Sequence, residues 1–501
     1  MEWNPLHDLT KDELIATVLE TRDQLAELAR CNREQAKQIE ELSRRLEELE
    51  KRNPTPRLDE AYSMKAEEKR QADAEQGGNS RRKKQKSKRR GRISTAEKLA
   101  QATMHQDIWP APHPLKDCRL KYSRPVWRII DGRAVLVAYH IHAGPDGRVP
   151  QIPGVPKRGE FGQEIIVALS WQHYIVGLSL DKVIAEQAFF WGLRLSKSQA
   201  DSLLNQLAKA WLPEFDALCQ LLAVSAVVYA DETSWSINSV WTFLSERARL
   251  TIFGCHKDGE TLAVLLKKDE FKGVLVSDDA AVYQGFDRAQ KCWAHLIRKA
   301  IRLTLLKPNC RRYRHFLDEL LEIYRRGKAI AADGRLSEAG RRKRVAELVN
   351  AVCNCTGGRF ADQSTPKDDA ERDFFNLTHE IVRLLGEDEL FTYAIYPEVA
   401  GTNNESEREL RDPAQDRATG QTNKTVHGGR RRTVITSVLN SLQLYISQFT
   451  LQTVLAELTR WQQGGISCFR RVVDSLKLPP LTLPEQVQSP LELLVPIPKP
   501  G

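Results

Sequence analysis

Two acidic side chains follow apolar, strand-like runs in this sequence, and they are the strongest candidates for chemistry. Residues 224–230 form an apolar run rich in valine that ends at Asp231, and residues 273–276 form a second run that ends at Asp278. Such runs are typical of strands buried on both faces. Two carboxylates at neighbouring strand ends repel each other unless a cation neutralises them. Because oxygen ligands of this kind suit Mg²⁺ or Mn²⁺, the pattern predicts a divalent-metal site.

A third carboxylate, Glu407, lies much later in the chain, in a short stretch with an Asn available as N-cap and Pro413 just past its end. These signals predict a short helix. A carboxylate on a helix above two strand-borne aspartates is the arrangement of a ribonuclease H-like domain. The alternative is three unrelated surface acids, since the chain has 66 Asp and Glu residues.

Helical geometry favours Glu407 over its acidic neighbours Glu405 and Glu409. At about 100° per residue, Glu405 and Glu407 cannot face one site together. Leu410 shares the face of Glu407 and is expected to turn that face inward. Glu405 and Glu409 are then expected to face water on the other side of the helix.

The order of several motifs resembles the insertion-sequence 66 family of bacterial transposases over roughly residues 125–445. The matching motifs are Ile152-Pro153-Gly154, the helices from Ser179 to Trp211, Tyr229-Ala230-Asp231-Glu232-Thr233, Ser277-Asp278 with Tyr283, Cys292-Trp293-Ala294-His295 with Arg298-Lys299, and Asn404-Glu405-Ser406-Glu407-Arg408 with Arg411. The resemblance implies that Asp231, Asp278 and Glu407 are a DDE triad, interrupted by an α-helical insertion before the Glu. It also implies a DNA transposase that cleaves and joins the ends of an insertion sequence, with small accessory proteins of the element as possible partners.

The chemistry expected of such a triad uses Mg²⁺ or Mn²⁺. Two divalent ions about 4 Å apart would activate a water, then a DNA 3′-hydroxyl, for in-line attack on phosphorus. A catalytically silent DNA-binding or regulatory protein derived from a transposase is one alternative, and a metal-dependent nuclease that cannot join strands is another. The intact acids argue against the first.

Two features depart from the family. Members of the family usually carry a cysteine-rich zinc-binding segment after an N-terminal coiled coil, and here only Cys118 stands in the corresponding region. The basic stretch after the Glu helix is not reproduced cleanly, and Arg417, Lys424 and residues 430–432 supply positive charge there.

Basic residues in three places are candidate DNA contacts. His295, Arg298 and Lys299 lie at the start of an expected helix, where cations suit binding of a phosphate. Separately, nine of the twelve residues from Arg81 to Arg92 are Lys or Arg. Such a run is either a salt-sensitive phosphate-binding arm or a solvated linker. The candidates are His295, Arg298, Lys299, Arg408, Arg411, Arg81, Arg82, Lys83, Lys84, Arg89 and Arg90.

The N-terminal segment has the apolar spacing of a coiled coil, with a single helix packed on its own domain as the alternative. Asn32 falls at an a position of the heptad, where Asn favours a parallel dimer in register. The seam consists of Leu14, Val18, Thr21, Leu25, Leu28, Asn32, Gln35, Ile39, Leu42, Leu46 and Leu49.

The fold class expected is α/β, with a mixed-sheet ribonuclease H-like core that carries an α-helical insertion, preceded by the coiled coil and a helical DNA-binding region. Ser179, Gly192 and the Ser196–Gln199 capping box predict two short helices joined by a turn, which fit a helix-turn-helix or a core hairpin. The expected regions are a coiled-coil dimerisation helix (1–52), a disordered basic linker (53–96), a small β-rich segment in place of a zinc ribbon (97–160), a helix-turn-helix-like region (161–220), the first part of the core (221–300), the insertion (301–392), the second part of the core (393–448) and a helical, then Pro-rich, tail (449–501).

The composition of the chain limits which partners, metal sites and cellular locations we expect. The chain has 501 residues, 41% of them hydrophobic, and a net charge of +9, which permits a polyanionic partner such as DNA. Its nine scattered cysteines support neither a disulfide framework nor a zinc knuckle. No apolar run reaches the length of a membrane span and the N-terminus does not resemble a secretory signal, so we expect a cytoplasmic, nucleoid-associated protein without a membrane partner.

The coiled-coil seam generates the first testable prediction. Residues 1–52 should form a dimer, and Asn32→Leu should strengthen association while loosening the preference for two strands, because Leu removes the buried polar pair that fixes register. Sedimentation equilibrium of both peptides measures this. A wild-type peptide that stays monomeric at tens of micromolar contradicts the prediction.

Overall fold

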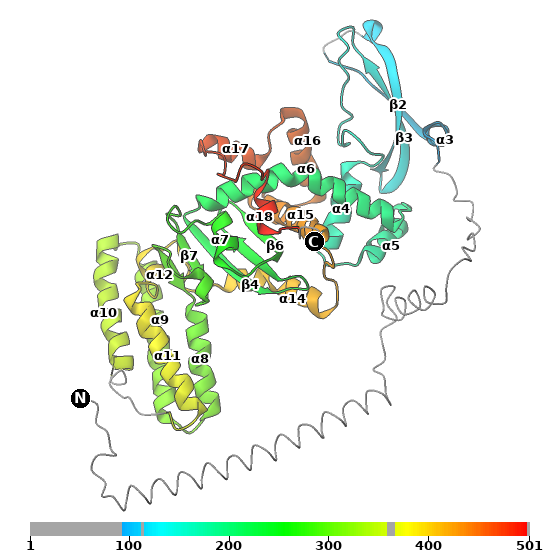
Figure 1. The fold of residues 1–501 in the computed structure, drawn as a ribbon. Coiled ribbons are helices and arrows are strands. Elements are labelled where there is room, and N and C mark those ends of the chain that lie inside the picture. Colours follow the sequence, from blue (N-terminus) through cyan, green and yellow to red (C-terminus); the bar gives the residue numbers. More distant parts are fainter. Residues whose placement is uncertain (1–92, 112–114, 358–365, 498–501) are drawn as a thin grey trace, which may run out of the picture. The chain divides into compact units, whose positions relative to one another are not determined.

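The computed structural model describes residues 93–111, 115–357 and 366–497 of the chain (Figure 1). These residues belong to one compact unit that begins at Ile93. The predicted coiled coil and the basic run 81–92 lie outside the described residues, and both stay predictions. No helix within the described ranges is long and apolar enough to cross a membrane.

The first elements form a small three-stranded sheet in the order β1-β3-β2. Strands β2 and β3 make one long antiparallel hairpin within the region 97–160, which was expected to be β-rich. Its turn is Asp131-Gly132, where both residues have positive φ, as a two-residue hairpin turn requires. The elements are α3 (Thr95–Ala100), β1 (Met104–Ile108), η1 (Leu115–Asp117), β2 (Arg119–Ile130) and β3 (Arg133–Ala143).

Three helices follow, α4 (Gln163–Tyr174), α5 (Leu180–Trp191) and α6 (Lys197–Ala223). The predicted caps of α5 and α6 are present, because Ser179 caps α5, Gly192 ends it in the left-handed conformation and Ser196 caps α6. The second helix was predicted to end near Trp211, but α6 runs through Pro213 to Ala223. Its apolar face continues to bury side chains such as Phe215 and Leu222, and this packing offsets the cost of the proline.

The central sheet has five strands in the order β6-β5-β4-β7-β8. Its first three strands form an antiparallel meander, while β7 pairs parallel to β4 and β8 pairs parallel to β7. The strands are β4 (Val227–Ser234), β5 (Ser239–Leu244), β6 (Arg249–Cys255), β7 (Val274–Ser277) and β8 (Ala289–Lys291), with α7 (Gly259–Leu265) and η2 (Ala281–Tyr283) in the connections.

Two strands differ from the sequence-based expectation. Strand β4 was expected to end at Asp231, but it continues to Ser234 because its antiparallel pairing with β5 extends that far. Strand β8 was not predicted at all. It has only three residues, and its Gln290 and Lys291 are polar side chains that are nevertheless buried.

Each face of the central sheet contributes to a different hydrophobic core. Val228, Ala230 and Leu275 belong to a core formed with α4, α6 and α15. Val227, Val274 and Val276 belong to a second core formed with α8 to α11. Residues alternate between faces along each strand, so odd positions of β4 and even positions of β7 face the second core.

The region 301–392 was predicted to be almost wholly helical, and its described residues contain helices and no strand. They form a helical layer over one face of the sheet, in which Trp293 at the start of α8 is fully buried. The helices are α8 (Trp293–Leu306), α9 (Arg311–Ala332), α10 (Glu338–Gly357), α11 (Asp369–Gly386) and α12 (Thr392–Ile395).

The chain then returns to the sheet through short helices and a long one. Helix α15 packs lengthwise against β6, and three of its hydroxyl side chains accept hydrogen bonds from the amides of that edge strand. Unpaired amides on a strand edge are otherwise free to pair with another chain. The helices are α13 (Asn404–Glu409), α14 (Arg411–Ala418), α15 (Val426–Tyr445), α16 (Leu451–Gly464), α17 (Cys468–Ser475) and α18 (Pro490–Leu494). The three bonds run from Arg249, Thr251 and Phe253 to Ser441, Ser437 and Thr433, over 2.9, 3.0 and 2.9 Å respectively.

This edge capping can be tested at Ser437, which is fully buried. Ser437→Ala should lower the free energy of unfolding by about 1–3 kcal/mol, because the buried amide of Thr251 loses its partner. Chemical unfolding measures the change. The control is Ser198→Ala at an exposed position of α6, which should stay within about 0.5 kcal/mol of the native chain. Equal effects at the two positions would contradict the role of α15 as an edge cap.

Candidate active site

The pairing of β4 with β7 places Asp231 and Asp278 side by side. In this pairing every β7 residue lies 47 positions after the β4 residue opposite it: Val274 pairs with Val227, and Val276 pairs with Tyr229. Asp278 lies the same 47 positions after Asp231, directly past the end of β7. Both aspartates also fall on the face of the sheet that α8 covers. The structure therefore brings together the first two residues of the predicted triad.

Each of these aspartates is followed by a second acid that a cation already neutralises. Glu232 points to the opposite face, where Lys257 and the hydroxyl of Tyr283 contact its carboxylate. Asp279 pairs with Arg383 of α11. By contrast, neither Asp231 nor Asp278 has an ion pair with any residue that the structure describes; each accepts a nearby backbone N–H.

The uncompensated charge is reflected in the pKa of Asp231. Burial raises the pKa of this carboxyl to about 7, and the negative charges of Glu232, Asp278 and Glu407 raise it as well, while the amide of Glu232 opposes the shift. Glu407 is thus close enough to Asp231 to raise its pKa, although it comes from a distant part of the sequence.

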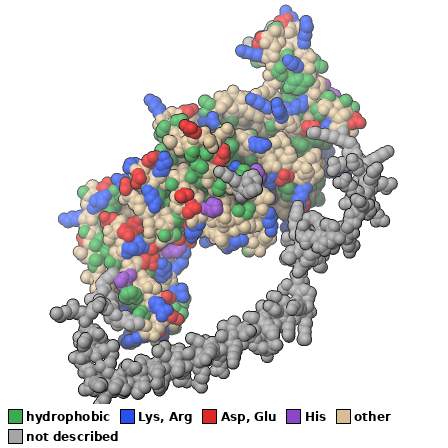
Figure 2. Space-filling view, viewed as in Figure 1, with side chains coloured by type: hydrophobic (Ala, Val, Ile, Leu, Met, Phe, Trp, Pro, Cys, Tyr) green, Lys and Arg blue, Asp and Glu red, His purple; other side chains and the backbone are tan. Residues whose placement is uncertain are grey.

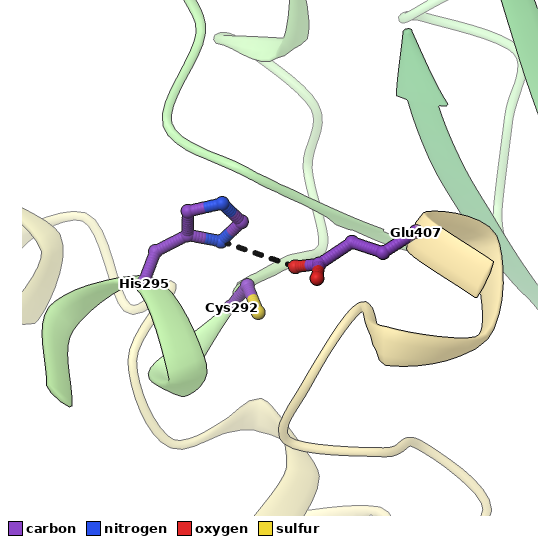
Figure 3. Close-up of side chains that lie close together, drawn as sticks. All are labelled: Cys292, His295 and Glu407. Carbon is purple, nitrogen blue, oxygen red and sulfur yellow. Dashed lines mark ion pairs between the residues drawn. The ribbon is translucent and has the colours of Figure 1, made fainter. Parts of the chain in front are cut away.

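Helix α13 directs Glu407 toward the start of α8. Its Oε2 accepts a hydrogen bond of 2.7 Å from Arg298, and its Oε1 lies 3.7 Å from His295 Nδ1 (Figure 3). The two neighbouring glutamates face a different cation, because Glu405 and Glu409 each lie 3.2 Å from Arg249 of β6.

The expectation that Glu405 and Glu409 both face water is therefore only partly correct. The side chain of Glu409 is 27% exposed, about as shielded as that of Glu407 at 24%. Burial raises the pKa of Glu409, while Arg249 lowers it. The side of the helix that carries Glu409 is closed by β6, which sequence periodicity could not show.

Asn403 is a residue at the centre of the site that sequence reasoning did not single out. We expected an Asn here to cap the helix, but its side chain makes no capping bond. Its Nδ2 instead donates to the carbonyl of Ala230 at 2.8 Å, directly before Asp231. Its backbone N–H donates to Cys292 Sγ at 3.1 Å. The fully buried Asn403 thus joins α13, β4 and the start of α8.

A cavity of about 480 Å³ opens beside Asp278, between the end of β7, α8 and α11. Lys291 of β8 lines it although this side chain is only 1% exposed, and its Nζ donates to Ser277 Oγ and to the carbonyl of Tyr283, both at 3.3 Å. Burial lowers the pKa of Lys291, while Glu389 and the nearby aspartates raise it. A lysine in a short polar strand gave no sequence signal for this position, since lysine is rarely buried.

The predicted DNA contacts fall into separate groups. His295 and Arg298 face Glu407, and Lys299 pairs with Glu380 of α11. Arg408 and Arg411 are exposed. Lysines and arginines are interspersed with acids on the face shown in Figure 2. The candidates Arg81, Arg82, Lys83, Lys84, Arg89 and Arg90 lie outside the described residues.

The three arginines after the Glu helix are engaged within the protein. Arg430 donates to the carbonyl of Val495 at 2.7 Å, Arg431 pairs with Asp201, and Arg432 pairs with Asp416. Arg432 is buried and lies over the ring of Phe253. The positive charge expected of residues 430–432 is therefore present, but Arg431 and Arg432 are paired with acids of the protein itself. An amphipathic helix against a sheet can use arginine stems and ion pairs as packing.

The acids fit a hard divalent cation. Asp231 and Asp278 offer oxygen ligands that form no ion pair within the described part of the chain, and Glu407 Oε1 is buried without a hydrogen-bond partner there. Clustered carboxylates in this state are costly unless a cation compensates them, and oxygen donors select Mg²⁺ or Mn²⁺.

Comparison with known proteins finds one matching family model. The model described as "Transposase IS66 family" matches residues 158–431, which include all three acids, the helical layer and Asn403. Among curated proteins, no match to the chain was found.

The charge state of Asp231 generates a prediction for the metal-free protein. The pKa of Asp231 is about 7 in the folded state and about 3.9 in the unfolded state. Between these values the folded state keeps a proton that the unfolded state has lost, so the free energy of unfolding decreases as the pH rises from about 4 to 7. Asp231→Asn cannot ionise, and in EDTA at pH 8 it should melt at a higher temperature than the native chain. Mg²⁺ should stabilise the native chain, by about 2.7 kcal/mol at a hundredfold excess over Kd, and the variant much less.

The matched control is Asp279→Asn, which removes an acid that Arg383 already neutralises. This change should lower the melting temperature in EDTA. If both variants shift it in the same direction, Asp231 does not carry uncompensated charge. Differential scanning fluorimetry between pH 5 and pH 8 measures both.

Proposed function

Since the chain belongs to the IS66 family of transposases, we propose that it cleaves DNA at the ends of an insertion sequence and joins those ends to a target. Asp231, Asp278 and Glu407 are proposed as the DDE triad of a ribonuclease H-like domain. The observation that carries the proposal is their convergence. Two aspartates that form no ion pair with any described residue lie at neighbouring positions on one sheet face, and a glutamate from a distant helix is close enough to affect the pKa of one of them.

The architecture supports this assignment. A five-stranded mixed sheet carries two of the acids, and the helical layer between the second aspartate and Glu407 corresponds to the insertion that the resemblance implies. Asp231 and Asp278 lie on the face covered by that layer, so the layer also forms one wall of the site.

The three carboxylates would hold Mg²⁺ or Mn²⁺. When bound, such ions favour deprotonation of the attacking hydroxyl and stabilise the leaving oxygen of an in-line displacement at phosphorus. The chain itself supplies placement: Asn403 fixes α13 against β4, and Arg298 orients the Glu407 carboxylate. Lys257 and Arg383 keep Glu232 and Asp279 from competing with the triad.

DNA contacts are proposed on both sides of this site. Arg408 and Arg411 are exposed next to Glu407, while His295 and Lys299 line the cavity beside Asp278. The basic run 81–92 is proposed as an arm that binds phosphates without sequence preference, with strong salt dependence. A dimer through residues 1–52 would bring two DNA ends together, and accessory proteins of the element and association with the nucleoid remain part of the proposal.

A metal-dependent nuclease would use the same carboxylates, and a silent DNA-binding derivative would use none of them. An assay with labelled element ends and a target duplex separates the three functions. Cleavage with joining supports the transposase, cleavage without joining indicates the nuclease, and binding without either indicates the silent derivative.

The triad assignment predicts the outcome of five isosteric substitutions. Asp231→Asn, Asp278→Asn and Glu407→Gln should each reduce Mg²⁺-dependent cleavage by about a thousandfold or more, because each removes a charge that holds the metal. Glu405→Gln and Glu409→Gln are matched controls on the same helix and should retain cleavage, since their carboxylates face Arg249 of β6, whereas the charge of Glu407 acts on Asp231. DNA binding, measured by gel shift, should persist in all five. Loss of cleavage in Glu405→Gln or Glu409→Gln with its survival in Glu407→Gln would overturn the assignment of the third acid.

A further inference from the structure

A second group of potential ligands lies immediately beside the proposed triad. Cys292 directly precedes α8, His295 lies in its first turn, and Glu407 approaches from α13 (Figure 3). One ligand atom from each of these side chains lies within 4.8 Å of the other two. Sulfur, nitrogen and oxygen donors therefore converge on one point from two elements that are distant in sequence.

Two of these atoms lack partners that their burial would require. His295 Nδ1 and Glu407 Oε1 are both buried and make no hydrogen bond to any described residue. They point toward each other across 3.7 Å, which is too long for a hydrogen bond. A buried polar atom without a hydrogen bond costs about 1–3 kcal/mol, so a cation bound by both atoms would recover that cost.

The surrounding contacts orient the three side chains. Arg298 donates a hydrogen bond to Glu407 Oε2, so that Glu407 Oε1 is the oxygen available to a metal ion. The backbone N–H of Asn403 donates to Cys292 Sγ at 3.1 Å and holds the thiol in place. Burial raises the pKa of this thiol, while the N–H of Asn403 opposes the shift. Outer contacts of this kind commonly position metal ligands and tune their affinity.

We propose that Cys292, His295 and Glu407 bind a transition-metal ion of the Zn²⁺ class, separately from the Mg²⁺ or Mn²⁺ of the triad. A thiolate and an imidazole are poor ligands for Mg²⁺ and good ligands for Zn²⁺. Three protein ligands with a fourth open position are a common zinc arrangement. Bonds of 2.0–2.3 Å place tetrahedral ligand atoms roughly 3.3–3.8 Å apart, so the side chains need to draw together by only about 1 Å.

Glu407 is shared between the two groups, which gives the second site a regulatory consequence. Zn²⁺ bound to Cys292 and His295 would hold the Glu407 carboxylate and withdraw it from Asp231 and Asp278. Zn²⁺ would then inhibit cleavage supported by Mg²⁺. This consequence rests on the proposed function, whereas the binding of the ion does not.

The binding is tested with the full chain, stripped of metal and kept in excess Mg²⁺, by titration with Co²⁺ as a spectroscopic substitute for Zn²⁺. A thiolate-to-cobalt charge-transfer band in the near ultraviolet is expected, and Zn²⁺ should displace it. Cys292→Ser should abolish the band and weaken Zn²⁺ binding about tenfold or more. Cys353→Ser, at an exposed cysteine of α10, is the matched control and should change neither.

Three further measurements keep the test decisive. His295→Gln should weaken Zn²⁺ binding as Cys292→Ser does, which covers the case that the buried serine impairs folding, and thermal unfolding checks both variants. Asp231→Asn should retain the cobalt band. Unchanged Zn²⁺ affinity in both Cys292→Ser and His295→Gln, or a band lost in Asp231→Asn and kept in Cys292→Ser, would overturn the site.

The regulatory consequence has its own readout. Zn²⁺ should lower the Mg²⁺-supported cleavage rate of the native chain and of Cys353→Ser by the same factor. Cys292→Ser, compared with its own rate in Mg²⁺ alone, should be inhibited about tenfold less. Equal inhibition of all three proteins would contradict the sharing of Glu407. Absence of cleavage in every protein would refute the proposed function and leave the cobalt result standing.

Discussion

The parallel pairing of β4 with β7 is the constraint on which the rest of the site depends. A pairing offset of 47 residues matches Asp231 to Asp278, so both carboxylates lie at one level on one face. A shift of one residue would turn every side chain of the strand to the other face. The buried valines prevent such a shift, because those on one face of the sheet pack in one hydrophobic core and those on the other face pack in a different core. Packing of apolar side chains therefore fixes the placement of the charged ones.

The distribution of charge around these acids follows from that placement. Glu232 and Asp279 are next to the triad candidates in sequence, but Lys257 and Arg383 neutralise them. Asp231 and Asp278 form no ion pair with any described residue, and burial, together with the neighbouring negative charges, raises the pKa of Asp231. The protein thus concentrates unfavourable electrostatic energy at one point, where a divalent cation would relieve it. The large cores on both sides of the sheet stabilise this strained arrangement.

The elements that close the site come from far along the chain. Asn403 holds α13 on β4 and also contacts Cys292 at the start of α8, so one buried side chain and its amide link three parts of the site. At the opposite edge, the hydroxyls of α15 satisfy β6 and hold the meander in place. The helical layer therefore covers one face of the sheet, while α15 contributes to the core on the other face and caps the edge strand β6.

The sequence by itself determined the local features and the family. Apolar runs marked β4 and β7, the caps Ser179 and Ser196 marked helices, and the ordered motifs identified an IS66 transposase, because these signals depend on near neighbours in the chain. Only the tertiary structure decided how far β4 extends and that β8 exists, since strand pairing is non-local. It also decided that Asn403 serves β4 rather than its own helix, that Glu409 faces Arg249, and that Arg431 and Arg432 are internal. The extension of β4 depends on partners in β5 that are five to nine residues away, and the other outcomes depend on partners more than ten residues away. No periodicity in the sequence encodes which partner that is.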